Sequence, residues 1–140
     1  MNAFTPQFTL SYRGDLRTEM THTASNARVT TDAPVDNHGK GAAFSPTDLA
    51  ASALASCMMT VVGIKANAMN LPIASMEARV EKTMGNGPRR ILRIAVELLI
   101  DIPNAGERER KILEATARAC PVAQSLHPEI DQAVCLMWAD

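Results

Sequence analysis

The amino-acid sequence predicts an α+β fold with the element order βββ-α-ββ-α-α-β. Alternating apolar and polar residues fill the first third of the chain, a long apolar helical run follows, and further strands and helices complete it. Because strands and helices occur in blocks, the pattern favours the α+β class over a doubly wound sheet. The length of 140 residues fits a single domain that covers residues 1–140.

The first three strands are predicted by their alternation. Residues 8–12 and 16–22 place strand-like side chains at every second position, and a turn at residues 13–15 joins them into a hairpin. Residues 27–31 predict a short third strand. Residues 32–44 then form a loop that is long enough to suggest a functional role.

A long helix is predicted to begin at Ser45 and to end near Asn70. Ser45 can cap this helix, Pro46 suits its first position, and Asp48 stands where a capping box places its acidic residue. After Asp48 the only charge in the helix is Lys65, and apolar or small residues cover nearly every face. Since such a helix must be surrounded by protein, we expect a sheet on one side and a second subunit on the other.

The second half of the chain predicts three more strands and two more helices. The strands are expected at residues 76–81, 91–102 and 130–138, and a turn at residues 86–88 joins the first two. Asn104 can cap a helix that has Glu107 at its third position. A break at Cys120-Pro121 precedes one or two turns of a last helix.

Composition and charge exclude several classes of function. The net charge of −1 creates no field that would attract nucleic acid or an anionic membrane, and 4% aromatic residues offer few platforms for base stacking. The start MNAFTPQFTL lacks the basic head and apolar run of a secretory signal. The apolar region at residues 49–64 is short for a bilayer. We therefore expect a cytoplasmic protein with neither nucleic acid nor membrane as a partner.

Three cysteines are candidates for chemistry, because in a reducing compartment cysteine is a core residue, a metal ligand or a redox centre. Cys57 lies inside the long helix and would need a cationic neighbour to become a thiolate; a buried structural cysteine is the alternative. Cys120 precedes Pro121 and would cap the last helix, where the positive helix end lowers a thiol pKa; a small apolar junction residue is the alternative. Cys135 lies between apolar residues of the last strand and is interpreted as a core residue.

Two segments resemble the OsmC/Ohr family. Ser45-Pro46-Thr47-Asp48-Leu49 and the alanine-rich run into Ala55-Ser56-Cys57 resemble its first-cysteine helix, and the segment ACPVAQSL at residues 119–126 resembles its second-cysteine segment. The spacing and the element order match along nearly the whole chain. The resemblance implies an intertwined homodimer with active sites at the subunit interface. It also implies a thiol peroxidase for oxidative-stress defence that reduces organic hydroperoxides and, less well, hydrogen peroxide.

The resemblance also assigns roles to two of the cysteines. The residue that matches Cys57 attacks the peroxide and becomes a sulfenic acid, and the residue that matches Cys120 resolves it as a disulfide. This assignment runs against the local pattern, which gives Cys120 the easier thiolate; tertiary neighbours outweigh local position in setting a pKa. A lipoyl-type or thioredoxin-type dithiol would restore both thiols. No metal and no organic cofactor is required.

The sequence departs from the family pattern at the carboxylate of the site. Peroxidases of this family hold the attacking thiolate with an arginine, and a glutamate after the helix-start proline orients that arginine. Thr47 stands at the glutamate position here. The next residue, Asp48, could serve instead, but we expect it to cap the helix. These departures place the chain with the less-characterised OsmC-like branch.

The arginine has two positions in the family. Asn37 occupies one of them, and the other lies near Arg17, which makes Arg17 the best candidate and Arg28 the second. An exposed strand arginine is the plainer interpretation of both. Further charge near the site could come from three residues of the loop: Asp36, His38 and Lys40. The plainer interpretation of each is a solvent-exposed loop residue.

Two other functions are consistent with the sequence. In the first, a dimer with this fold binds a small apolar ligand without peroxidase activity, and Met58, Met59 and Met69 give the pocket an adaptable lining. Methionine as core filler is the plainer interpretation. In the second, Cys57 and Cys120 bind a metal with His22 or His38, but no CxxC or HxxxH spacing supports this.

Overall fold

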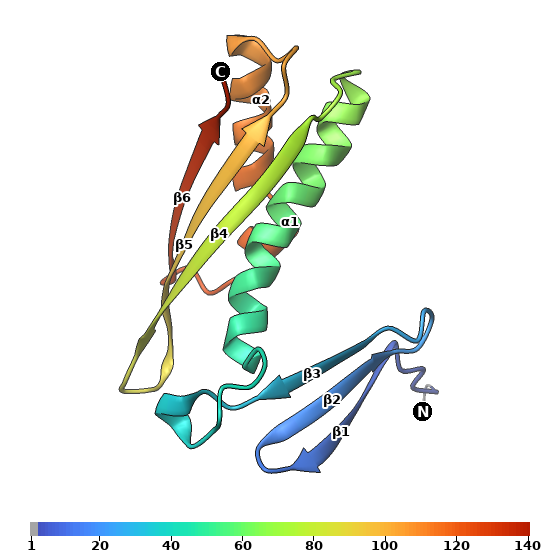
Figure 1. Ribbon diagram of the computed structural model, residues 1–140, viewed down its shortest axis with the longest axis vertical. Coiled ribbons are helices and arrows are strands. Elements are labelled where there is room, and N and C mark those ends of the chain that lie inside the picture. The colour runs from blue at the N-terminus through green and yellow to red at the C-terminus, as the bar shows by residue number, and fades with distance from the viewer. Residues whose placement is uncertain (1–2) are drawn as a thin grey trace. The chain divides into compact units, whose positions relative to one another are not determined.

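The computed structural model describes residues 3–140, and its elements follow the predicted order (Figure 1). The described residues group into two compact units, the described part of Met1–Leu49 and Ala50–Asp140, with the boundary in the first turn of the long helix. The assignment of residues 1–140 to one domain stays a prediction. The elements are β1 (Phe8–Gly14), β2 (Arg17–His22), β3 (Arg28–Asp32), η1 (Val35–Asn37), α1 (Pro46–Ala68), β4 (Ser75–Gly85), β5 (Arg90–Asp101), α2 (Glu107–Arg118), α3 (Pro121–Ser125) and β6 (Asp131–Trp138).

The first unit is built on an antiparallel sheet with the strand order β1-β2-β3. The predicted hairpin is confirmed: Asp15 and Leu16 have φ angles of 54° and 62°, the left-handed pair that closes a two-residue hairpin turn. Phe8, Leu10 and Tyr12 alternate on one face of β1, and all three are exposed in the chain. The predicted loop begins one residue later than expected, because Asp32 still pairs within β3.

The start of α1 confirms the predicted capping box. The Ser45 backbone N–H donates to the Asp48 carboxylate at 2.9 Å, and the Asp48 N–H donates to the Ser45 hydroxyl at 3.1 Å. Each side chain thus satisfies a backbone group that the helix itself leaves unpaired. Ser45 is buried, so water does not replace the lost partner easily when the hydroxyl is removed.

Ser45→Ala is expected to lower the free energy of unfolding by about 1 kcal/mol, because the Asp48 N–H loses its acceptor. Urea denaturation followed by circular dichroism measures this change. The control is Ser52→Ala, which removes a hydroxyl in the interior of the same helix, outside the capping box. Equal losses in the two variants would contradict the capping role.

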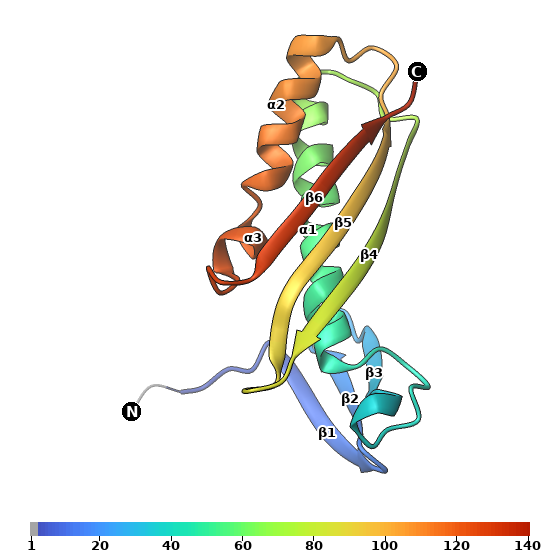
Figure 2. The same cartoon turned by 90° about the vertical axis from the view of Figure 1, so that its left-hand side faces the viewer.

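The second unit is a sheet with one face covered by helices. Its strand order is β4-β5-β6, with β4 antiparallel and β6 parallel to β5. Figures 1 and 2 show α1 and α2 on the same face of this sheet, and α2 and α3 form the crossover between the parallel strands. Alternate residues of β5 form the centre of the core with side chains from α1: Ile94, Val96, Leu98, Ile100, Leu54, Met58 and Val62.

The prediction that a sheet covers one side of α1 is therefore confirmed. The prediction that a second subunit covers the other side stays a prediction. Among residues 3–140, α1 is the one helix long and apolar enough to cross a membrane by composition. A core helix satisfies the same criterion, and Leu54, Met58 and Val62 of α1 are fully buried in the second unit.

Two local predictions are wrong. Asn104 does not cap α2, because the chain first makes a turn in which the Ala105 N–H bonds to the Ile102 carbonyl; Gly106 is the residue at the cap. Cys135 is exposed rather than buried. Its neighbours Val134 and Leu136 pack against the core, so the alternation of the strand turns Cys135 to the opposite face.

Candidate functional site

Cys57 lies on the fourth turn of α1, between the covered and the open sides of the helix. Leu54 and Met58 on the same helix are fully buried, whereas Ser56 is exposed. Cys57 itself is half-buried and packs against the core cluster. Packing against the core holds the Cys57 side chain in place, and its partial exposure leaves it accessible to a small reagent.

Cys120 lies at the N-cap of α3, as the sequence predicts. Its backbone is extended, Pro121 follows as the first helical residue, and its sulfur accepts the Ala123 N–H at 3.4 Å. The side chain is only 1% exposed. The crossover from α2 therefore carries Cys120 into the core, where solvent does not reach it.

The fold brings Cys57 and Cys120 together, although they are far apart in the sequence. Cys57 lies close enough to Cys120 to raise the pKa of the Cys120 thiol, and all three cysteines of the chain are free thiols. The contact joins α1 to the start of α3 within the second unit. A disulfide between them requires their Cα atoms to lie about 4.4–6.8 Å apart.

Burial raises the pKa of the Cys120 thiol above its ordinary value, and the neighbouring Cys57 raises it further. The Ala123 and Val122 N–H groups act in the opposite direction, as the helix end was expected to do, but they are outweighed. The local expectation that Cys120 holds the easier thiolate is therefore wrong. The buried thiol keeps its proton and can donate it in a hydrogen bond to Cys57.

The predicted supporting residues all belong to the first unit. Arg17 pairs with Asp32 at 3.6 Å, and Lys40 is an exposed loop residue. Asp48 serves in the capping box, and the Thr47 hydroxyl lies 3.2 Å from that of Ser45. Their roles in the reaction remain predictions.

The remaining candidates have ordinary surroundings. Arg28 lies 3.9 Å from Glu19, and His22 bonds to the Ser25 hydroxyl. His38 is exposed in the loop after η1. Within residues 3–140, no three His, Cys, Asp or Glu side chains are grouped closely enough to share a metal ion.

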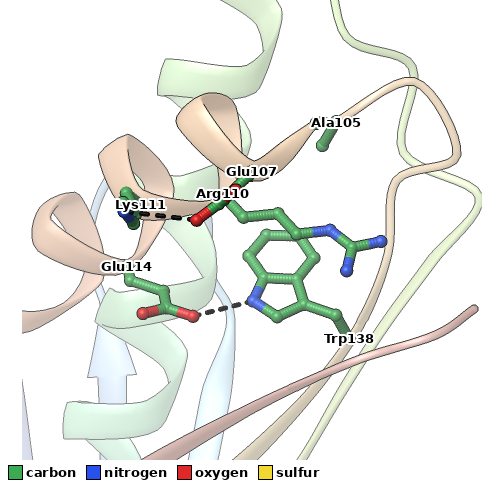
Figure 3. Close-up of a pocket in the computed structure, with 7 residues that line it drawn as sticks. Ala105, Glu107, Arg110, Lys111, Glu114 and Trp138 are labelled. Carbon is green, nitrogen blue, oxygen red and sulfur yellow. Dashed lines mark hydrogen bonds and ion pairs between the residues drawn. The ribbon is translucent and has the colours of Figure 1, made fainter.

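A separate hollow of about 460 Å³ lies beside the start of α2 (Figure 3). The Trp138 indole N–H donates to Glu114 at 2.8 Å, and the Arg110 guanidinium lies over the ring, 5.2 Å from its centroid. The Arg110 Nε has no partner among the described residues, but it is buried, so a ligand in the hollow would not reach it. These contacts hold the end of β6 against α2.

Two features of the molecule were missed at the level of sequence. Asp32 is a buried carboxylate opposite Arg17, and the register of β2 and β3 is the signal that could have found it. The Trp138 contacts join residues of α2 to the last strand, and no sequence pattern pairs them.

Comparison with known proteins gives consistent matches. The model of the family described as OsmC-like protein matches residues 38–134. The crystal structure of a putative osmotic stress induced and detoxification response protein from Psychrobacter arcticus 273-4 is 46% identical, with 96% of this chain and 98% of that chain covered and a TM-score of 0.87. A comparison with the curated proteins gives no match.

More distant solved structures share the fold. An OsmC-like protein from Mycoplasma pneumoniae is 17% identical, with both chains covered to 100% and a TM-score of 0.79. An organic hydroperoxide resistance protein OsmC from Legionella pneumophila is 19% identical, with 98% of this chain and 99% of that chain covered and a TM-score of 0.69. At these identities the likeness is one of fold.

Proposed function

The chain belongs to the family of OsmC-like proteins, and on this premise we propose that it is a thiol-dependent peroxidase that reduces organic hydroperoxides and hydrogen peroxide. The observation that carries the proposal is the proximity of one half-buried thiol, Cys57, to one buried thiol, Cys120, whose pKa it raises. The Legionella relative is described as an organic hydroperoxide resistance protein, which supports the same chemistry.

Cys57 is more exposed than Cys120, so in the proposed reaction Cys57 meets the peroxide first. The Cys57 thiolate attacks a peroxide oxygen, an S–O bond forms, the O–O bond breaks, and the alkoxide leaves as an alcohol after taking up a proton. Cys57 is then a sulfenic acid. Cys120 condenses with it, so that an S–S bond forms and water leaves. A dithiol of lipoyl or thioredoxin type returns both cysteines to thiols by exchange.

The electrostatics of the pair support this division of roles. The raised pKa of Cys120 keeps it protonated next to Cys57, so two neighbouring thiolates do not repel each other. The Cys120 S–H can donate to the Cys57 thiolate and stabilise it. We propose Arg17 as the cation that adds to this stabilisation, with Lys40 as a secondary source of charge and with Thr47 and Asp48 at the helix start.

We further propose a cytoplasmic homodimer. Three large apolar side chains of β1, Phe8, Leu10 and Tyr12, are exposed together on one face of the first sheet. On α1, Ile64 is also exposed in the single chain. Monomeric proteins rarely leave such patches uncovered, and a second copy of the chain would cover them.

A thiol count tests the peroxidase proposal. The reduced protein is treated with one equivalent of cumene hydroperoxide, and free thiols are counted alongside a non-reducing peptide map. We expect rapid loss of the Cys57 and Cys120 thiols and a peptide crosslink between them. Cys135 is exposed on the opposite face of its sheet and serves as the internal control, because it should remain a thiol.

One outcome would overturn the proposal. If all three thiols persisted through a large excess of several peroxides, the chain would not be a peroxidase. A dimer that binds a small apolar ligand would then become the working hypothesis, and a ligand retained by the purified protein would support it.

A further inference from the structure

The reduction of an alkyl hydroperoxide needs a proton as well as a thiolate. When the Cys57 thiolate attacks the peroxide, the O–O bond breaks and the second oxygen leaves as a strongly basic alkoxide. An acid beside this oxygen lowers the barrier, because it supplies the proton while the bond breaks. Such an acid has to lie close to Cys57, where the peroxide reacts.

The face of α1 that carries Cys57 does not supply this acid. The residues three and four positions away on the helix have no ionisable group: Ala53, Leu54, Thr60 and Val61. The Thr60 hydroxyl donates to the Ser56 carbonyl at 2.8 Å, so its proton is already used. A proton for the leaving oxygen therefore comes from another element or from water.

Cys120 is an acid that the fold brings close to Cys57. Val122 and Ala123, which follow Cys120 on α3, pack against the same core as α1 (Figure 2). Cys120 is 1% exposed, and this burial raises the pKa of its thiol, as does the neighbouring Cys57. The thiol thus keeps its proton in the resting protein and loses it only to a strong base, such as an alkoxide.

The first turn of α3 prepares the Cys120 sulfur to lose this proton. The sulfur accepts the Ala123 N–H at 3.4 Å, which uses a lone pair and leaves the S–H able to donate. The Ala123 and Val122 N–H groups lower the pKa of Cys120, although its burial outweighs them. The same N–H groups stabilise the negative charge that forms on the sulfur once the proton has left.

We propose that Cys120 is a second catalytic residue, whose S–H donates its proton to the leaving oxygen of the peroxide before the same sulfur resolves the sulfenic acid. This role rests on the peroxidase function proposed above. The Cys57 sulfur takes one oxygen with its hydrogen and is oxidised to the sulfenic acid, while the other oxygen leaves as an alcohol with the Cys120 proton. Cys120 is then a thiolate. It attacks the sulfenic acid, the disulfide forms, and hydroxide leaves and becomes water with a proton from solvent.

Oxidants with different leaving groups test this role. Cumene hydroperoxide releases a basic alkoxide that needs a proton, whereas peroxybenzoic acid releases benzoate, which is stable as an anion. In Cys120→Ala, the rate of Cys57 oxidation by cumene hydroperoxide should fall at least about tenfold relative to the rate with peroxybenzoic acid. The reduced full-length protein is mixed with each oxidant and quenched by alkylation, and mass spectrometry of the Cys57 peptide gives both rates.

The ratio of the two rates separates proton donation from other effects of the substitution. A change in the amount of Cys57 thiolate, or in the folded fraction, alters both rates equally and leaves their ratio unchanged. The matched control is Cys120→Ser, whose hydroxyl still donates a hydrogen bond to the leaving oxygen. Cys120→Ser should therefore keep the wild-type ratio, although it cannot form the disulfide.

Cys120→Val keeps the test decisive if Cys120→Ala does not fold. Valine is apolar, fills more of the buried space and suits the extended backbone before Pro121, so it should change the ratio as alanine does. A wild-type ratio in the folded alanine or valine variant would overturn the role of Cys120 as a proton donor and leave the peroxidase proposal standing. A wild-type protein whose thiols survive both oxidants would instead remove the proposed function, and this role with it.

Discussion

Cys57→Ser is expected to abolish peroxide reduction, whereas Cys120→Ser is expected to keep the first step and to stop after one turnover. The serine hydroxyl is a poor nucleophile without a base, so the loss at Cys57 should be at least about a thousandfold. At position 120 the variant removes only the resolving thiol. The sulfenic acid at Cys57 should then persist long enough to be captured by dimedone and identified by mass spectrometry.

The control for both variants is Cys135→Ser. Cys135 is exposed, and it lies on the opposite face of the sheet from the residues that pack on the core. We expect Cys135→Ser to consume peroxide at the wild-type rate over many turnovers with a dithiol reductant. If Cys57→Ser retained activity and Cys120→Ser lost it entirely, the roles of the two cysteines would be reversed.

Leu98→Ala should be among the most destabilising single changes in the chain. Leu98 lies on β5 at the centre of the core and is 0% exposed. Truncation removes its buried methyl groups and leaves a cavity, so we expect the free energy of unfolding to fall by about 2–5 kcal/mol. Urea denaturation followed by the fluorescence of Trp138, the one tryptophan of the chain, measures the change.

The next residue on the same strand provides the matched control. Leu99 points to the opposite face of the sheet and is 46% exposed. Leu99→Ala makes the same chemical change and should cost less than about 1 kcal/mol. Similar losses at positions 98 and 99 would mean that both faces of β5 are covered in solution.

Local chemistry predicted much of this fold from the sequence. The capping box of Ser45 and Asp48 and the cap at Cys120-Pro121 depend on neighbouring residues only, and both are confirmed. The element order is confirmed because hydrophobic period and turn residues are also local signals.

Except for the Asn104 cap, which a local turn displaces to Gly106, the misses depend on contacts between distant segments. The pKa of Cys120 is raised chiefly by its burial in the core, which opposes the local effect of the helix end. Cys135 was placed on the wrong face because its apolar neighbours suggested a buried strand, whereas only alternate residues of β6 pack on the core. The partner of Arg17 could not be read without the register of β2 and β3, which brings Asp32 opposite it.

The contact between Cys57 and Cys120 also has a consequence for chain entropy. A disulfide between them closes a loop of about 60 residues, which restricts the unfolded chain and favours the folded state by about 4 kcal/mol. The oxidised intermediate of the proposed cycle would therefore resist unfolding more than the resting dithiol. Under oxidative stress, the same peroxide that the protein consumes would protect the protein itself, and reduction would return it to the less stable form.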